Sequence, residues 1–225
     1  GTGALDEELL LAVFRQETLM RKQKEWMPWS DEPGLSTAVR HSESRLRTSP
    51  KLRQAVIGLL GYASPLAART RFQVALSLGA AAVDEDVLLA LVGIAIRDAA
   101  SEPHRIAVLS SVSGSERKLL AQIWARVESE KAWERPGMRE LVGEVARVIG
   151  ARKVDEEVEA VRQLIAKSVE LAARANVENG DELDRRRFEM AAFRGLVSAG
   201  GHQPVDLVGQ PPQQTAGSMR VLFES

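Results

Sequence analysis

The chain has 225 residues, of which 44% are hydrophobic, so it is long and apolar enough to build a folded core. Its 30 basic and 31 acidic residues are mixed along the sequence and leave a net charge of −1, which argues against the basic surface typical of nucleic-acid-binding domains. The absence of cysteine excludes disulfides, thiolate metal sites, cysteine nucleophiles and covalently attached haem.

Helix-start and helix-stop residues divide the chain into a regular series of short helices. Serine followed by proline, at residues 49–50 and 64–65, is a typical helix start, because the hydroxyl accepts a hydrogen bond from a free amide and proline has no amide to leave unpaired. Acidic clusters such as residues 84–86 favour the positive end of a helix dipole, and Gly79 and Gly150 are expected to end helices. In chain order, the predicted helices span 5–24, 35–47, 50–61, 66–78, 87–97, 105–111, 117–127, 138–149, 154–175 and 182–198.

The helical pattern predicts an all-α fold, because no short segment alternates apolar and polar residues with enrichment in β-branched side chains. A single helix pair cannot bury both of its faces. We therefore expect a right-handed α-solenoid of about five HEAT-like antiparallel helix pairs with a concave face. The solenoid is predicted to cover residues 1–199, and residues 200–225, which contain several glycines, prolines and glutamines, are predicted to form a loose C-terminal tail.

An arginine recurs near the start of the second helix of each predicted pair. Arg40, Arg71, Arg105, Arg139 and Arg187 follow one another at intervals of 31, 34, 34 and 48 residues. A period of this length is typical of stacked repeats. The expected role is structural, a bridge from each arginine to an acidic or carbonyl group of the neighbouring repeat. The alternative is a row of positive charge that binds an anionic partner.

Residues 68–79, Ala-Arg-Thr-Arg-Phe-Gln-Val-Ala-Leu-Ser-Leu-Gly, resemble the second helix of a HEAT repeat. Segments 3–12, 38–43, 71–79 and 105–111 together resemble the helical-repeat segment of planctomycete-type membrane-bound dehydrogenase/cytochrome proteins, over roughly residues 3–127. In those bacterial proteins the segment lies between a sugar-dehydrogenase-like β-propeller and a c-type cytochrome domain. The chain has no Cys-X-X-Cys-His haem motif and no room for a propeller, so none of the family's catalytic residues carries over. The resemblance implies a linking or docking module of a larger redox protein, exported or periplasmic.

Residue patterns of catalytic and metal sites are scarce in this sequence. His41, His104 and His202 are scattered, whereas a metal site needs convergent ligands. Ser110 and Ser111 lie near His104, but a helical serine without a third partner is a poor catalytic triad. We therefore expect no enzyme, no metal and no cofactor.

Three tryptophans lie in predicted loops. Trp26 and Trp29 flank a Met-Pro pair, and Trp133 closely precedes Arg135-Pro136. Such rings are candidates for binding a protein partner, because a large rigid side chain gains contact area at low entropic cost. The alternative is that the rings fold back and cover the ends of neighbouring helix pairs.

The leading hypothesis is a non-catalytic scaffold that binds another protein or a neighbouring domain of its parent chain. The alternative is a DNA-binding enzyme similar to the HEAT-like DNA glycosylases, although the charge balance disfavours it. A chromophore-attachment scaffold, as in the HEAT-like bilin lyases, finds no supporting residue. The longest apolar run, residues 87–96, is too short to span a bilayer, so no membrane insertion is expected.

The sequence begins Gly-Thr-Gly rather than with methionine, and we interpret it as a segment trimmed from a longer protein. A terminal repeat cut from a longer array lacks its polar cap, so self-association through that repeat is also expected.

Overall fold

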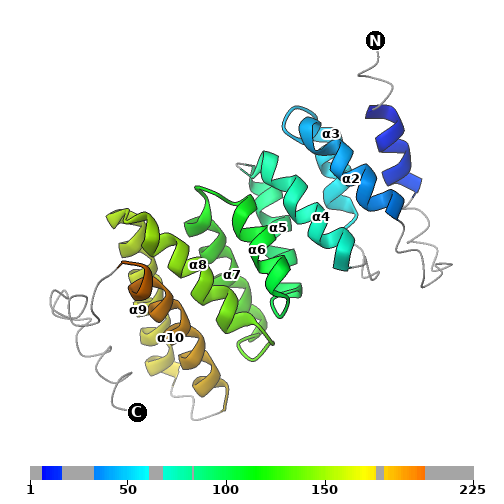
Figure 1. Cartoon of the computed structure of the whole chain (residues 1–225). Coiled ribbons are helices and arrows are strands. Elements are labelled where there is room, and N and C mark those ends of the chain that lie inside the picture. The colour runs from blue at the N-terminus through cyan, green and yellow to red at the C-terminus, as the bar shows by residue number, and fades with distance from the viewer. Residues whose placement is uncertain (1–6, 17–32, 61–67, 83, 176–179, 201–225) are drawn as a thin grey trace. The chain divides into compact units, whose positions relative to one another are not determined.

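The computed structural model describes residues 7–16, 33–60, 68–82, 84–175 and 180–200. Within this part of the chain there are ten α-helices and no β-strand, so the predicted all-α class is confirmed (Figure 1). The chain divides into two compact units, Gly1–Ser113 (unit 1) and Gly114–Ser225 (unit 2). None of the described helices is both long and apolar enough to cross a membrane.

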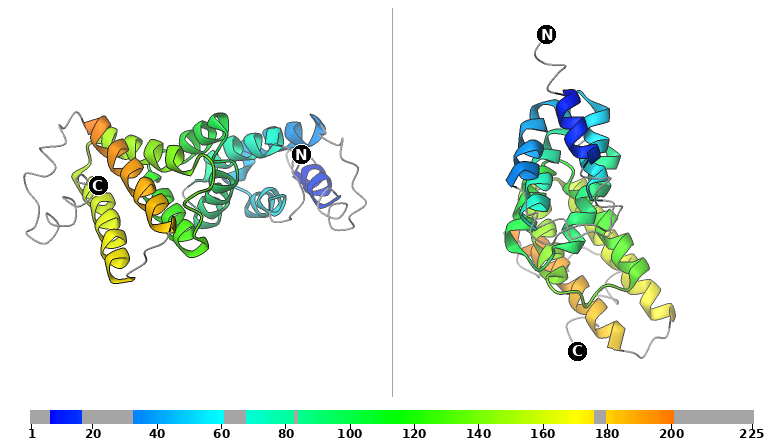
Figure 2. Two further views of the ribbon diagram at one scale, coloured as in Figure 1. Left: turned by 90° about the horizontal axis from the view of Figure 1, so that it is seen from below. Right: turned by 90° about the vertical axis from the view of Figure 1, so that its right-hand side faces the viewer.

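Unit 1 is built from short helices in two rows. Its elements are a helix over residues 7–16, α2 (Pro33–Leu46), α3 (Pro50–Gly58), α4 (Ala68–Leu78), the 3₁₀ turn η1 (Gly79–Ala81), α5 (Glu85–Arg97) and α6 (Glu102–Ser111). In this unit α4 lies between α2 and α6, and the further views in Figure 2 agree. Helices α3 and α5 form the second row, so the core lies between the two rows.

The start of α3 follows the predicted Ser-Pro signal. Ser49 is the N-cap, and its hydroxyl accepts a hydrogen bond from the Leu52 amide at 3.2 Å. The same hydroxyl donates to Glu7 Oε1 at 2.6 Å, which ties the first helix to this cap. The second predicted Ser-Pro start, residues 64–65, lies outside the described residues.

Three predicted helix starts in unit 1 were too late, including that of α5, which begins at Glu85 rather than at residue 87. Helix α2 begins at Pro33 and includes residues 33–34, which we had assigned to a loop. Proline suits a first turn because its φ angle is already helical and it has no amide to leave unpaired. Helix α6 begins at Glu102 rather than at residue 105, again with a proline in its first turn.

Apolar side chains from both rows meet in the core of unit 1. Helix α5 is almost wholly apolar, and seven of its residues are buried. Burying one large aliphatic side chain stabilises a fold by about 1.5–3 kcal/mol. Core residues of this unit include Val39, Leu52, Val56, Val74, Leu78, Val87, Leu91 and Val108.

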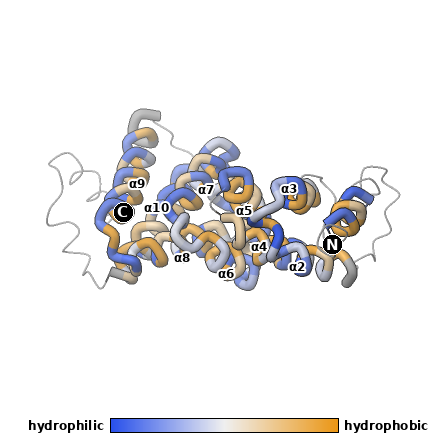
Figure 3. The backbone as a smooth tube through the Cα atoms, turned by 90° about the horizontal axis from the view of Figure 1, so that it is seen from above, coloured by the Kyte–Doolittle hydropathy of each residue, from blue (hydrophilic) through white to orange (hydrophobic). Residues whose placement is uncertain are grey.

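Unit 2 contains four longer helices, α7 (Glu116–Glu130), α8 (Met138–Arg152), α9 (Asp155–Ala175) and α10 (Gly180–Gly200). Hydropathy alternates along α9 in Figure 3, and Val161 and Ile165 on this helix are buried. A charged cluster joins three of the helices: Arg152 Nη1 on α8 lies 2.5 Å from Glu116 Oε2 on α7 and 3.5 Å from Glu157 Oε2 on α9.

The prediction that Gly150 ends a helix was wrong. Gly150 lies inside α8, which continues to Arg152, and it is buried. The chain then turns at Lys153 with a φ of 54°, and α7 likewise ends at Lys131 with a φ of 50°. Glycine is the usual residue at such left-handed caps, so the two lysines gave no stop signal in the sequence.

Three glycines of unit 2 serve helix packing. Gly143 and Gly150 on α8 lie against α10, and Gly195 on α10 lies against α8. A Cβ atom added to Gly150 would lie 2.5 Å from the carbonyl oxygen of Leu196, and one added to Gly195 would overlap the backbone of Gly143. The two helices therefore approach backbone to backbone, which only glycine permits at these positions.

Replacing Gly195 with alanine should destabilise unit 2 by about 1–3 kcal/mol or more, because α8 and α10 must move apart to admit the methyl group. The matched control is Gly93→Ala in α5, where an added Cβ meets no atom within 4 Å. That change should stabilise the protein by about 0.5–1 kcal/mol, since alanine favours the helical backbone. Urea unfolding followed by circular dichroism measures both effects, and a loss of stability in neither variant would contradict the packing argument.

Candidate functional site

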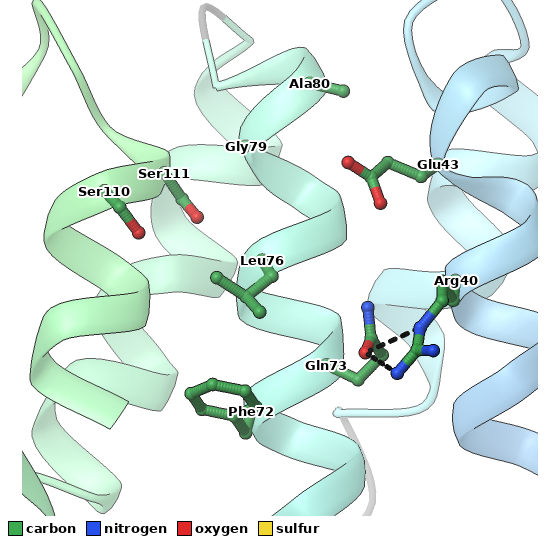
Figure 4. A pocket seen from close by; sticks show the side chains of 9 residues that line it. All are labelled: Arg40, Glu43, Phe72, Gln73, Leu76, Gly79, Ala80, Ser110 and Ser111. Atoms are coloured by element: carbon green, nitrogen blue, oxygen red, sulfur yellow. Dashed lines mark hydrogen bonds between the residues drawn. The ribbon is translucent and has the colours of Figure 1, made fainter. Parts of the chain in front are cut away.

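A trough of about 570 Å³ crosses the row of α2, α4 and α6 in unit 1 (Figure 4). Its floor is one face of α4 and the following turn, and its walls are α2 and α6. The lining residues are Arg40, Glu43, Phe72, Gln73, Leu76, Gly79, Ala80, Ser110 and Ser111.

The floor is apolar at one end and made of small residues at the other. Phe72 and Leu76 are one turn apart on α4 and only half-buried, so they present carbon surface to the trough. Gly79 lets α6 approach closely, because an added Cβ would lie 2.9 Å from Ser111 Cβ. The Ser111 hydroxyl lies 2.8 Å from the carbonyl oxygens of both Ala75 and Ala107, which holds α6 beside α4.

The α2 wall carries two opposite charges. Arg40 Nε and Nη2 donate to Gln73 Oε1 at 3.4 and 3.3 Å, and both Arg40 and Glu43 are exposed. Figure 4 shows the two side chains directed over α4 rather than toward each other. The wall on α6 is formed by serine, so the charges of the trough lie on one side only.

The hydroxyls of the trough are engaged with the main chain. Ser110 Oγ donates to Ala107 O at 2.9 Å, within its own helix. The nearest histidine in sequence, His104, is also occupied: its Nε2 lies 2.8 Å from Ala68 O and its Nδ1 lies 2.7 Å from Ser101 Oγ. Because a carbonyl can only accept, Nε2 donates to Ala68, while Nδ1 shares a hydrogen bond with the Ser101 hydroxyl. Among the described residues, the ring nitrogens of His104 are therefore engaged with Ala68 and Ser101 rather than with Ser110 or Ser111.

His104 belongs to a polar network at the start of α4 and α6. Its ring stands edge-on to Phe72, with ring centroids 5.8 Å apart. His41 is exposed, and its Nδ1 lies 2.8 Å from Thr37 O. His202 lies outside the described residues. Among the residues that are described, no group of three histidine or carboxylate side chains is placed to hold a metal ion.

The five recurring arginines do not make equivalent contacts. Arg71 donates through Nε and Nη2 to both carboxylate oxygens of Asp98 at 2.7 and 2.6 Å, and the two side chains are largely buried. Arg105 Nη1 donates to Ala99 O at 2.8 Å in the same turn. These two arginines therefore hold the turn between α5 and α6, while Arg40 contacts Gln73 of α4.

The last two arginines differ from the first three. Arg139 is exposed and makes no hydrogen bond or ion pair with the described part of the chain. Arg187 pairs with Asp184 at 3.2 Å on its own helix. Neither makes the bridge to a neighbouring repeat that the spacing had suggested. The burial of Arg71 with its carboxylate partner also removes it from any exposed row of positive charge.

Trp133 lies inside unit 2, where only 5% of its surface is exposed. Its ring and that of Trp124 both stand edge-on to Phe188, at centroid distances of 5.2 and 4.9 Å. The Trp133 ring is therefore packed inside unit 2 and is not accessible to a partner in this structure. Trp26 and Trp29 lie outside the described residues.

Sequence reasoning missed the trough, because residues 68–79 were interpreted only as a repeat signature. One signal was present: Phe72 and Leu76 are spaced by four, off the face of α4 that buries Val74 and Leu78. An apolar pair outside the core stripe of a helix indicates a surface available for contact.

Unit 2 contains a buried carboxyl group that the sequence did not reveal. Glu189 on α10 is 1% exposed and accepts a hydrogen bond from Ser168 Oγ on α9 at 2.6 Å. Arg185 Nε lies 3.4 Å from the same Oε1 atom, and Oε2 has no hydrogen-bond partner among the described residues. Burial raises the pKa of Glu189, although the Ser168 hydroxyl and the Arg185 charge oppose that change.

Comparison of the chain with models of known protein families, with curated proteins and with solved structures gives no significant match.

Glu189 should make unit 2 less stable as the pH rises. Its pKa is raised in the folded state, so its favourable contribution is complete below the unfolded pKa near 4.5 and is lost as the pH rises through the folded pKa. Glu189→Gln keeps an acceptor for Ser168 but cannot ionise. Its unfolding midpoint should match the wild type near pH 4 and exceed it at pH 7, whereas exposed Glu156→Gln should follow the wild type throughout. Equal midpoints at pH 7 for the wild type and Glu189→Gln would contradict the assignment.

Proposed function

We propose that the protein is a non-catalytic, HEAT-like scaffold that binds a protein segment in the trough of unit 1. The observation that carries this proposal is the composition of the trough: an apolar floor, opposite charges on one wall and small side chains on the other. Binding grooves combine apolar area with a few polar groups that orient the ligand. The partner is another protein or a neighbouring domain of the parent chain.

The finer architecture, a right-handed α-solenoid of about five helix pairs, is part of this proposal. Contacts at a nearly constant sequence separation support it. In unit 1 the Arg40–Gln73, His104–Ala68 and Ser111–Ala75 hydrogen bonds join residues 33, 36 and 36 apart, and all link one second helix to the next. A nearly constant offset is expected when one supersecondary unit repeats along the chain.

Two further parts of the proposal rest on the sequence resemblance alone. They are the role of the module in linking or docking the domains of a larger redox protein and its export from the cytoplasm. DNA binding, the alternative from the sequence, is disfavoured by Glu43, because a carboxylate in the trough repels phosphate.

A substitution that fills the trough tests the proposal. Purified protein is used to select binders from a phage-displayed random-peptide library, and the affinity of an enriched peptide is measured by fluorescence polarisation. Ser110→Trp places a large ring over the floor and should weaken binding at least about tenfold, which corresponds to about 1.4 kcal/mol.

The control is Ser44→Trp, which adds the same ring to an exposed serine of α2 that does not line the trough. It should bind like the wild type, and circular dichroism should show both variants folded. A library that enriches no peptide, or an enriched peptide that binds Ser110→Trp as tightly as the wild type, would refute the proposal.

A further inference from the structure

The charges on the α2 wall are separated from each other and from other charges. Arg40 and Glu43 are three residues apart on one helix, so they lie roughly 4.5 Å apart along its axis. Neither forms an ion pair with any residue that the structure describes, and Arg40 contacts only the neutral Gln73 amide oxygen, at the long end of the hydrogen-bond range. Both side chains are exposed and extend over the trough (Figure 4).

Two other arginines of unit 1 are paired with carboxylates. Arg71 forms a two-point contact with Asp98, and Arg53 Nη1 lies 3.1 Å from Asp84 Oδ2. Because Arg40 and Glu43 have no such partner among the described residues, both charges remain available to bind a ligand. A guanidinium and a carboxylate that are already solvated but not paired can each exchange water for an oppositely charged partner group.

From this arrangement we propose that the trough selects a partner segment carrying an acidic and a basic residue about one helical turn apart. The acidic residue lies opposite Arg40, the basic residue lies opposite Glu43, and an apolar side chain of the same segment covers Phe72 and Leu76. This inference rests on the proposed function, because it specifies the partner of the same trough.

The order of the charges gives the selectivity. A segment that binds in the opposite order brings like charges together, and repulsion between them disfavours that complex. A uniformly charged partner, such as a nucleic acid backbone or a polybasic tail, meets one repulsive group in either orientation. The apolar floor strengthens the discrimination between the two charge orders. Covering the floor removes water from beside the charges, and attraction and repulsion between charges are both stronger where the dielectric constant is lower.

The shape of the trough limits the length of the segment. Its floor runs from Phe72 to Ala80, which corresponds to roughly 12 Å at about 1.5 Å of helical rise per residue. Two helical turns, or about four extended residues, span this distance. The paired charges are thus three or four residues apart in a helical segment and two apart in an extended one.

The experiment is a peptide-library selection on two proteins, the wild type and the double charge exchange Arg40→Glu with Glu43→Arg. Peptides from the wild-type selection should share an acidic and a basic residue at this spacing with an apolar residue nearby. The exchanged protein should enrich the same residue types in reversed order. A wild-type peptide should lose about tenfold or more in affinity for the exchanged protein, and a peptide with its two charges exchanged should recover it.

Single neutral variants keep the test decisive if the double exchange does not fold. Arg40→Gln and Glu43→Gln should each weaken an enriched peptide about fivefold and reduce the dependence of its affinity on salt. Arg47→Glu reverses an exposed arginine just beyond the end of α2 and outside the trough, so it should leave the affinity almost unchanged.

The outcomes separate the two proposals. The inference is overturned if Ser110→Trp blocks the binding of peptides that show no charge order, or if the enriched peptides bind the charge variants as tightly as the wild type. In both cases the proposed function stands. Absence of any enriched peptide, or peptides insensitive to Ser110→Trp, overturns the proposed function itself. Self-association in sedimentation velocity that Ser110→Trp abolishes would make a second copy of this chain the occupant and also overturn the inference.

Discussion

Close approach between α4 and α6 in unit 1, and between α8 and α10 in unit 2, is the constraint on which the rest of each unit depends. In unit 1 it is achieved between α4 and α6, where Gly79 lies against Ser111 and serine and histidine side chains bond to main-chain carbonyls of the adjacent helix. In unit 2 it is achieved between α8 and α10 by three glycines. Because side chains are small or absent at these contacts, the separation of the helices is determined by the backbone, and any larger group changes it.

This constraint also shapes the trough. Gly79 and Ser111 bring the α6 wall close to the end of the floor, while Phe72 and Leu76 protrude enough to be only half-buried. The Arg40 contact with Gln73 positions the opposite wall. The floor, the small-residue wall and the charged wall are therefore consequences of one packing arrangement, and the binding proposal depends on the same residues that hold the helices together.

The largely buried charges of Arg71 and Glu116 are paired, whereas the exposed charges of the trough form no ion pair within the described part of the chain. Inside the units, Arg71 is matched by Asp98 and Glu116 by Arg152, since an unpaired charge in a low-dielectric interior is strongly unfavourable. Glu189 has only a serine hydroxyl and a more distant arginine, and its raised pKa is the physical consequence. On the surface, Arg40 and Glu43 remain available because water solvates them at little cost.

Local signals in the sequence were sufficient for the all-α class and for most helix positions. Ser49-Pro50 starts α3, the apolar run of α5 is buried, and Gly79 ends α4, because caps, propensity and apolar periodicity act over a few neighbouring residues. Helix boundaries that depend on contacts with a distant helix could not be predicted in this way. Gly150 is the residue type expected at a helix end, yet it lies inside α8 in contact with α10. The lysines at the left-handed caps carried no recognisable stop signal.

The candidate site depended most on tertiary structure. The recurring arginines share a spacing, but their acceptors lie in different places: in the turn between α5 and α6 for Arg71 and Arg105, and on the same helix for Arg187. Trp133 had the sequence context of an exposed loop residue, and only its contact with Phe188, 55 positions further along the chain, placed it inside unit 2. The sequence by itself determined which residues form helices, through short-range capping and periodicity. The tertiary structure alone decided which side chains line the trough and which charges are paired, because both depend on helices that are distant in sequence.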